Sequence, residues 1–350
     1  MEMKKNGSVI RVLILFIWIL GFSNNANGQI TDTIVSAIEG IKDQLLYRDN
    51  DSNYIENYGN QIAGKLVGVS KLNYFRIRDN DTQSSLRFRP SRELNLGVGL
   101  AHKFFAFDLT FQTKIGENKD VENTRALDVQ VRLFTSKHLL SSTLQNYKGY
   151  RLAGATGINS PIEIQNTDRR DLRTMNFNLQ YMYAFNYTRF SMKAPFVFNE
   201  RQKKSAGSVV FGAQFGILDV SSDSSLIPIE WTSDFNPNMN LTSLSLLNVG
   251  AGIGYMHTFI IERHFFVTLS IIPGMVFNYG DYYLNQITEL PSGFNLSVRS
   301  MNSLGYNGDR FFAGASIIFD NFFASIDTRQ RVEMGSGKIS AFVGYRFGNR

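Results

Sequence analysis

The histidines are the first residues to consider for chemistry, because imidazole binds transition metals and titrates near neutral pH. The chain of 350 residues has four of them, at His102, His138, His257 and His264. None forms an H-x-H or H-x-x-x-H pair, and the chain has no cysteine to complete a metal site. Each lies next to a predicted tight turn. We therefore interpret them as residues at the rim of a sheet and predict neither a metal site nor a cofactor.

A catalytic serine would need a histidine base and an acid that orients the base. Ser141 and Ser142 follow His138 on one predicted strand, and Asp128 lies on the strand before it. Serines near turns are common in any sheet protein. We predict that the chain is not an enzyme, and a lipid-modifying enzyme is kept as the lesser alternative.

Three glycines in the run Gly250-Ala-Gly252-Ile-Gly254 lie on one face of a predicted strand. They do not open a helix, so they are not a dinucleotide-binding fingerprint. Small residues there let a sheet curve or leave space in front of it.

The elements that position these residues are strands with one apolar and one polar face. In the segment 104–115, Phe105, Phe107, Leu109 and Phe111 alternate with smaller or polar residues such as Asp108. A period of two places the two sets on opposite faces of a strand. The segment 125–136 repeats the pattern, which predicts an antiparallel hairpin with an apolar face and a charged face.

Segments of this kind recur along the chain and predict an all-β fold, an antiparallel transmembrane β-barrel of about 14 strands. Tight connections at 102–103, 136–137, 186–187, 262–263 and 307–308 alternate with longer polar ones, as in outer-membrane barrels with short periplasmic turns. An even number of strands must separate two periplasmic turns. For this reason the weak segment 225–233 is counted as a strand beside 189–200, with a periplasmic turn at 221–225. Merging 189–219 into one strand gives 12 strands as the alternative.

Charged residues share the face opposite the aromatic set and are predicted to line the lumen. The lumen-lining candidates are Asp108, Lys114, Asp128, Arg132, Lys193, Arg299 and Arg346. The same face carries the amides Asn176, Asn178, Gln180 and Gln214. Charges of both signs can pair across the interior and stiffen the wall, or they can form a polar path for a solute.

The beginning of the chain has the order of an export signal. Lys4, Lys5 and Arg11 precede the apolar run 12–20, and Ala26-Asn27-Gly28 supplies a small-residue cleavage site. We expect a signal peptide over 1–28, a periplasmic segment over 29–60 and the barrel over 61–350. Helical spacing of apolar residues predicts a short amphipathic helix at about 33–47.

Composition excludes several classes of protein. After the predicted signal, no run approaches the roughly 20 apolar residues of a membrane helix. Removing Lys4, Lys5, Arg11 and Glu2 from the totals of 36 basic and 30 acidic residues leaves a net charge of +4. That charge is too small for a nucleic-acid-binding surface, so no nucleic-acid partner is expected.

Several blocks of sequence resemble a known family. They are NYGNQIAGKLVGVSKLNYFRIRDN, YKGYRLA, RRDLRTMNFNLQYMYAFNYTRFSMKAPFVFNERQKKSAGSVVFGA and DSSLIP. These blocks are similar to an uncharacterised family of Bacteroidota proteins, a domain of unknown function, over roughly residues 50–347. The resemblance implies an outer-membrane protein of a Gram-negative envelope and no particular chemistry. The residues that stand at its recurrent motif positions are Arg169, Arg170, Asp171, Arg173, Lys203, Lys204, Ser205 and Asp223.

The expected location is the outer membrane, with its lipid and lipopolysaccharide as partners. Five basic residues are predicted in extracellular loops, where they could meet lipopolysaccharide phosphates. They are Arg169, Arg170, Arg201, Lys203 and Lys204. The last segment, 338–347, ends in Phe347 and resembles the C-terminal signal that barrel-assembly machinery reads. The expected function is non-enzymatic passage or binding of a small solute, with a structural or adhesive envelope protein as the alternative.

Overall fold

The computed structural model describes most of the chain after its first 49 residues. The described residues are 50–72, 74–90, 94–112, 125–159, 168–283, 287–289, 292–325 and 329–348. The chain divides into two compact units, Met1–Tyr47 and Arg48–Arg350, and everything described below belongs to the second. The expected signal peptide and the expected helix at 33–47 lie outside the described residues.

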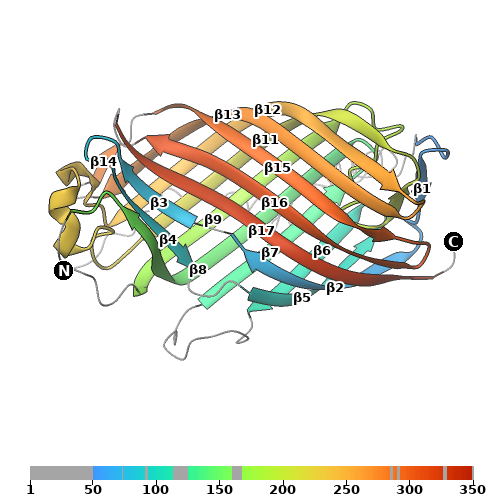
Figure 1. Ribbon diagram of the computed structural model, residues 1–350, viewed down its shortest axis with the longest axis horizontal. Helices are drawn as coiled ribbons and strands as arrows, with labels where there is room; N and C mark the ends of the chain where they lie inside the picture. Colours follow the sequence, from blue (N-terminus) through green and yellow to red (C-terminus); the bar gives the residue numbers. More distant parts are fainter. Residues whose placement is uncertain are drawn as a thin grey trace, which may run out of the picture. The chain divides into compact units, whose positions relative to one another are not determined.

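Strands account for nearly all of the regular structure (Figure 1). They are β1 (Ile55–Asn57), β2 (Ile62–Lys71), β3 (Tyr74–Asp79), β4 (Ser84–Pro90), β5 (Leu94–His102), β6 (Phe105–Gln112), β7 (Arg125–Phe134), β8 (His138–Thr156), β9 (Asp168–Ala184), β10 (Glu200–Gln202), β11 (Ala206–Ser221), β12 (Ser243–Ile261), β13 (Phe265–Tyr283), β14 (Ile287–Glu289), β15 (Gly293–Asn307), β16 (Phe311–Ser325) and β17 (Gln330–Phe347). Two short 3-10 helices, η1 (Ile229–Asp234) and η2 (Pro237–Met239), lie between β11 and β12. No helix of the described residues is long and apolar enough to cross a membrane.

The large sheet closes on itself, so the fold is an antiparallel β-barrel, as predicted. The last strand, β17, pairs with β16 on one side and with β2 and β3 on the other. Twelve of the described strands form the complete ring, in the order β2, β5, β6, β7, β8, β9, β11, β12, β13, β15, β16 and β17. The ring therefore has 12 strands, which is the alternative number, and not the expected 14.

The strands that pair in the wall differ between the two ends of the barrel. β3 continues the line of β2 along β17, and β4 pairs with β3 on one side and with β8 on the other. Near the opposite end, β6 and β7 separate β5 from β8. A register shift of β8 between Lys148 and Tyr150, with Gly149 at a φ of 91°, marks the level of the change. A positive φ suits glycine because it has no Cβ.

The two ends of the barrel differ in their connections. The turn end carries the short connections 103–104, 135–137, 262–264 and 308–310, and the loop end carries the connection 222–242. Figure 1 shows η1 and η2 at the loop end and β1 at the turn end.

Two segments that were predicted as strands are not part of the wall. Residues 189–200 form turns and bends up to Glu200, the first residue of the short β10, and all of them except the exposed Arg189 are buried. Residues 225–233 contain most of η1. Pro195 and Pro228 lie within these segments, and proline has no N–H to donate to a strand ladder. The predicted two-residue hairpin at 186–187 is also wrong, because the chain from 185 to 205 folds inward between β9 and β11.

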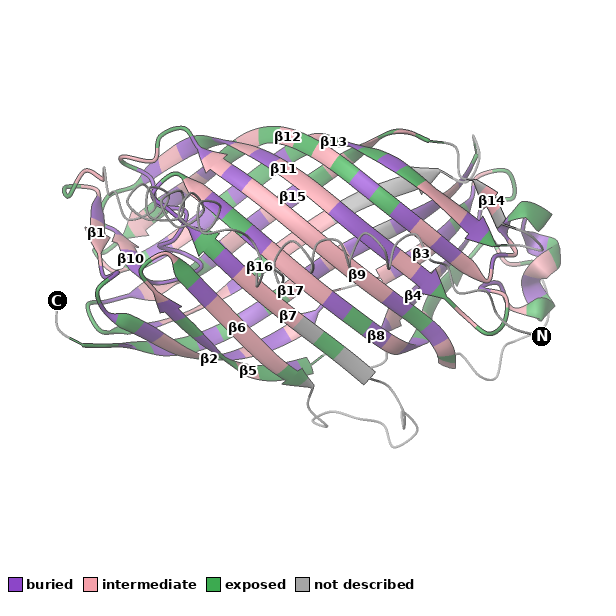
Figure 2. Cartoon of the chain, turned by 180° about the vertical axis from the view of Figure 1, so that it is seen from behind, coloured by how far each residue is buried: buried purple, intermediate pink, exposed green. Residues whose placement is uncertain are grey.

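The outer face of the barrel is apolar, as the alternation predicted. Leu66, Phe111 and Leu296 are 63%, 62% and 71% exposed. Figure 2 shows buried and exposed residues alternating along the strands. Soluble proteins rarely expose a continuous apolar belt, whereas transmembrane barrels turn one toward lipid.

Candidate functional site: a polar chamber between two closures

A polar chamber lies in the middle of the lumen. Its cavity volume is about 100 Å³, and its lining includes Gln145, Asn176, Asn178 and other amides from neighbouring strands. On the wall formed by β11, β12 and β13 the chamber is lined by small residues, among them Gly212, Gly250, Gly252 and Gly274. Small residues leave room in front of the strands.

One charge network crosses the chamber above these glycines. Arg299 on β15 pairs through Nε with Asp320 on β16 and donates through Nη2 to Gln214 on β11 at 2.8 Å. Gln180 on β9 donates to the second oxygen of Asp320 at 3.1 Å. A Cβ on Gly212 would lie 3.9 Å from Arg299 Nη1, so the guanidinium lies over the glycine wall. The network therefore braces opposite parts of the ring.

A second network lies nearer the turn end. Asp108 on β6 accepts from Lys65 on β2 at 2.9 Å and from Arg132 on β7 at 3.1 Å. Gln130 Oε1 accepts from Arg132 at 2.5 Å and from Lys338 on β17. Paired, hydrogen-bonded charges can stay inside a barrel because each ion compensates the desolvation of its partner.

The turn end of the lumen is filled by the connection 185–205, which we call the plug. Every residue from 190 to 200 is buried. The ring of Phe198 stacks on Phe312 with centroids 4.6 Å apart and also contacts Phe266 and Phe342. Phe190, Met192, Phe196 and Val197 join the same apolar cluster of wall residues. Apolar burial is thus a large part of what holds the plug in place.

The plug also contains a buried ion pair. Lys193 Nζ lies 2.5 Å from Glu200 Oε1, and the two side chains are 8% and 1% exposed. The other oxygen of Glu200 accepts from Ser191 Oγ at 2.5 Å. Asn50 and Asn57, which lie outside the plug, also donate to Glu200 Oε1. A charge at this depth is tolerated because it has an ion-pair partner and several hydrogen bonds.

Arg346 fastens the plug to the last strand of the barrel. Its guanidinium is fully buried and donates to the carbonyl oxygens of Phe198 at 2.7 Å and Gly308 at 2.5 Å, and also to Asn307 Oδ1. The guanidinium carbon lies 4.1 Å from the centre of the Tyr58 ring. One side chain therefore joins the plug, the β15–β16 turn and the segment before β2.

The loop end is covered by the connection 222–242, which we call the cap. Leu226, Trp231, Phe235 and Met239 of the cap are buried in one apolar cluster with the wall. The wall residues of that cluster include Phe75, Leu86, Phe88, Tyr150, Leu218 and Tyr282. The chamber therefore lies between two packed segments of the chain.

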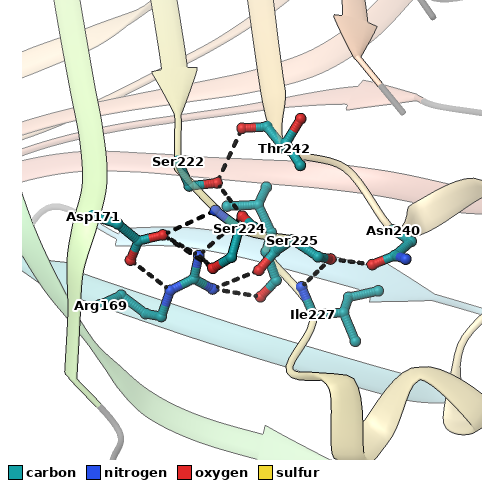
Figure 3. A network of polar contacts seen from close by, with 9 residues as sticks. Arg169, Asp171, Ser222, Ser224, Ser225, Ile227, Asn240 and Thr242 are labelled. Atoms are coloured by element: carbon teal, nitrogen blue, oxygen red, sulfur yellow. Dashed lines mark hydrogen bonds and ion pairs between the residues drawn. The ribbon is translucent and has the colours of Figure 1, made fainter. Parts of the chain in front are cut away.

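A polar lock attaches the cap to β9 (Figure 3). Arg169 forms a two-pronged pair with Asp171, both contacts being 2.9 Å, and donates to the carbonyl oxygens of Ser224, Ser225 and Leu226. Asp171 in turn accepts from the hydroxyl of Ser224 at 3.2 Å. Within the cap, Ser225 Oγ donates to Asn240 and accepts from the N–H of Ile227.

Charge and hydrogen bonding make the lock insensitive to mild acid. Partial burial raises the pKa of Asp171, but the hydrogen bonds and charge of Arg169 outweigh that effect and bring the pKa to about 2. The carboxylate is therefore ionised at any pH above about 4.

The structure separates the predicted lumen-lining residues into three places. Asp108 and Arg132 meet in the second network, and Arg299 lies in the first. Lys193 and Arg346 belong to the plug and its anchor. Lys114 and the side chain of Asp128 lie outside the described residues.

The predicted grouping of basic loop residues at one end is wrong. Arg169 and Arg170 lie at the loop end on β9, whereas Arg201, Lys203 and Lys204 lie at the turn end. Arg201 pairs there with Glu56 and Asp309. The error arose because 189–200 was counted as a strand, which moved the residues after it to the wrong end. The predicted periplasmic turn at 221–225 is wrong as well, because 225–233 was counted as a strand: Ser221 ends β11, and residues 222–225 belong to the cap at the loop end.

Several residues of the site were not predicted. Lys65, Asp320 and Lys338 lie on predicted strands at positions of inward parity, so the alternation could have found them. Glu200 has no such signal, because nothing in its local sequence distinguishes a plug from a strand. The candidate base His138 has Nδ1 2.7 Å from Tyr181 Oη, while Ser141 Oγ accepts from Gln130. Among the described residues no group of three or more histidines and acids could hold a metal ion.

Comparison with solved structures finds barrels of low similarity. The outer membrane protease OmpT from Escherichia coli is 8% identical with a TM-score of 0.35, covering 83% of this chain and 98% of its own. The Pseudomonas putida toluene transporter TodX is 10% identical with a TM-score of 0.26, covering 83% and 91%. The COG4313 outer membrane channel from Pseudomonas putida F1 is 10% identical with a TM-score of 0.28, covering 85% and 99%. Neither the protease nor the channel activities are carried over at this similarity.

No curated protein is a detectable relative of the sequence. A family model described as a domain of unknown function (DUF4421) matches residues 49–347, which is most of the chain and includes the plug, the chamber and the cap. The chain therefore belongs to the DUF4421 family.

Proposed function

We propose that this protein is an outer-membrane barrel that binds a small solute in its central chamber and admits it by release of the cap. The observation that carries the proposal is a polar chamber with a packed segment of the chain at each end. A structural barrel has no need of an interior cavity faced with amides and glycines. A passive pore would have an open path, whereas here the plug and the cap occupy the two ends.

The cap is the better candidate for the moving part. Its lock consists of side chains partly accessible to solvent at the barrel rim, with Arg169 14% and Asp171 21% exposed. The plug is held by the fully buried Arg346 and by the buried pair of Lys193 and Glu200. Low-stability elements usually supply the motions that admit ligands.

The membrane location rests on the outer face and on the beginning of the chain. An apolar belt surrounds a polar interior, and the first 28 residues have the pattern of an export signal. With the turn end in the periplasm, the cap faces the outside of the cell, where a solute would arrive.

Thiol labelling tests this proposal directly, because the chain has no cysteine. Thr143, which lines the chamber, is replaced by Cys, and a small water-soluble methanethiosulfonate reagent is added to the folded barrel. We expect slow labelling in this protein and at least tenfold faster labelling when Arg169→Ala is added. Arg173→Ala is the matched control, since Arg173 is exposed on the same strand and makes no contact with the lock among the hydrogen bonds described for it.

Two outcomes count against the proposal. Fast labelling with the cap intact would mean that the chamber is already open to solvent. Equal labelling in Arg169→Ala and Arg173→Ala would mean that the lock does not control access, and the structural alternative would then be favoured.

A further inference from the structure

A second cavity lies beside the chamber, between the plug and the wall. Its volume is about 30 Å³, and most of its lining is apolar. Met182 on β9, Met301 on β15 and Met192 in the plug line it together with Phe134 and Phe196. We call it the methionine pocket.

The methionine pocket and the chamber are adjacent. Gln130, Gln180 and Ile318 line both cavities. A molecule that extends from the chamber toward the plug has to pass between these three side chains. The combined space is polar on one side and apolar on the other.

The chemistry of the polar side favours an uncharged group. Arg299 is paired with Asp320, Asp108 accepts from both Lys65 and Arg132, and Gln130 accepts from Lys338, so each of these four cations already has an acceptor in the protein. The remaining amides present both donors and acceptors. Among the described residues the buried Oδ1 of Asn178 has no hydrogen-bond partner, which leaves an acceptor at the chamber wall. A hydroxyl or carboxamide matches such a lining.

The chemistry of the apolar side favours a short hydrocarbon group. Apolar cavities bind apolar groups rather than water, and methionine side chains adapt to ligands because they are unbranched and flexible. A cavity of 30 Å³ has room for about two water-sized groups, and one of 100 Å³ for roughly seven to ten.

We infer that the ligand is a small amphipathic molecule, with a neutral hydrogen-bonding head in the chamber and a tail of two to three carbons in the methionine pocket. This inference rests on the proposed function, because it assigns a ligand class to the same chamber.

The experiment measures binding of a homologous series, acetamide to hexanamide, to the full-length barrel in lipid nanodiscs by saturation-transfer NMR. Empty nanodiscs measure partition into lipid. We expect acetamide to bind weakly and each of the first two or three added methylenes to tighten binding about fourfold, the ratio for burial of one methylene. Further methylenes should add nothing, because the pocket is then full.

Two substitutions of Met301 distinguish binding in the methionine pocket from nonspecific hydrophobic binding. Met301→Gln keeps the length of the side chain but makes it polar, so the gain per methylene should fall toward onefold. Met301→Leu keeps an apolar side chain of similar volume and should keep the gain. Thermal unfolding of both variants checks that the plug remains packed.

The outcomes distinguish this inference from the proposed function. Amides that bind with equal affinity at every length would overturn the methionine pocket and leave the chamber as a binding site. Affinity that keeps rising to hexanamide, unchanged in Met301→Gln, would place the tail elsewhere and also overturn it. No binding by any amide, with chamber labelling unaffected by the cap lock, would defeat both.

Discussion

Replacing Arg346 by Met should detach the plug while leaving the barrel folded. The methionine keeps most of the length and packing of the arginine but donates no hydrogen bond to Phe198, Gly308 or Asn307. A buried hydrogen bond to a charged group contributes about 1.5–3 kcal/mol, and a buried acceptor left without a donor costs about 1–3 kcal/mol. These terms are not additive, so we expect a loss of on the order of 3–5 kcal/mol in the free energy of unfolding.

The assay is urea unfolding of the purified barrel in detergent, with limited proteolysis to report on the plug. Arg346→Met should be cut within 185–205 under conditions that leave the unsubstituted protein intact. Arg346→Lys should be cut more slowly than Arg346→Met and faster than the unsubstituted protein. An ammonium group keeps the charge but cannot reach the several acceptors that the planar guanidinium group reaches. Arg310→Met is the control, since the exposed side chain of Arg310 lies at the same end and, among the described residues, makes one long hydrogen bond, 3.4 Å, to the carbonyl oxygen of Gly348. Arg346→Met with unchanged stability and an intact plug would refute the anchoring role.

Four further predictions concern the lipid face, the lumen charges, the lock and the orientation of the barrel. Leu109→Arg should cost about 2–4 kcal/mol in unfolding measurements because it places a charge on the lipid face, and an unaffected variant would contradict the face assignment. Asp108→Asn should lower the free energy of unfolding by about as much, because it leaves Lys65 and Arg132 without their carboxylate. The local sequence around Asp108 does not predict this loss. The pKa of Asp171, about 2 in the folded protein, lies below its unfolded value of about 3.9, so the lock should hold above pH 4 and weaken as the pH falls toward 2; labelling of the chamber cysteine that accelerates already between pH 7 and 5 would contradict this. An epitope inserted after Gly308 should stay hidden from antibody on intact cells, and its display would reverse the orientation.

The alternation of apolar and polar residues was sufficient to predict the wall. Asp108 was assigned to the lumen from its position between Phe107 and Leu109, and it pairs there with Lys65 and Arg132. A strand in a barrel is specified locally, because each residue faces lipid or lumen according to its parity. β2 and β17, which pair to close the barrel, both show this alternation.

The plug could not be separated from a strand by the same pattern. Met192, Ala194, Phe196 and Phe198 share one parity and the polar Lys193 and Asn199 the other, as they would in a wall, yet residues 190–200 are all buried inside the ring. The parity of the turns did not reveal the error either. Counting both 189–200 and 225–233 as strands keeps an even number between the two turns, as does counting neither.

The partners of the charged residues were beyond the reach of local sequence. Arg169 and Asp171 stand at motif positions of the family, but their contacts with Ser224 join positions 55 and 53 apart in the chain. Such a contact follows from the path of β9, β11 and the cap together, and no period in the sequence encodes it. The site therefore depends on how the plug and the cap fold onto the barrel, which local sequence does not determine.

The plug and the cap differ in the interactions that must be broken to open each end of the chamber. Removing the plug would require breaking the buried pair of Lys193 and Glu200, releasing Arg346, and exposing five apolar side chains of the plug to water. Each step leaves an uncompensated charge or apolar area, so their costs accumulate before any alternative contact can form. Lifting the cap also exposes apolar side chains, but the polar groups of its lock lie at the rim, where water can replace the hydrogen bonds that Arg169 and Asp171 lose. Under the proposed function we therefore expect a solute to enter the chamber through the cap, with the plug as the fixed base of the chamber.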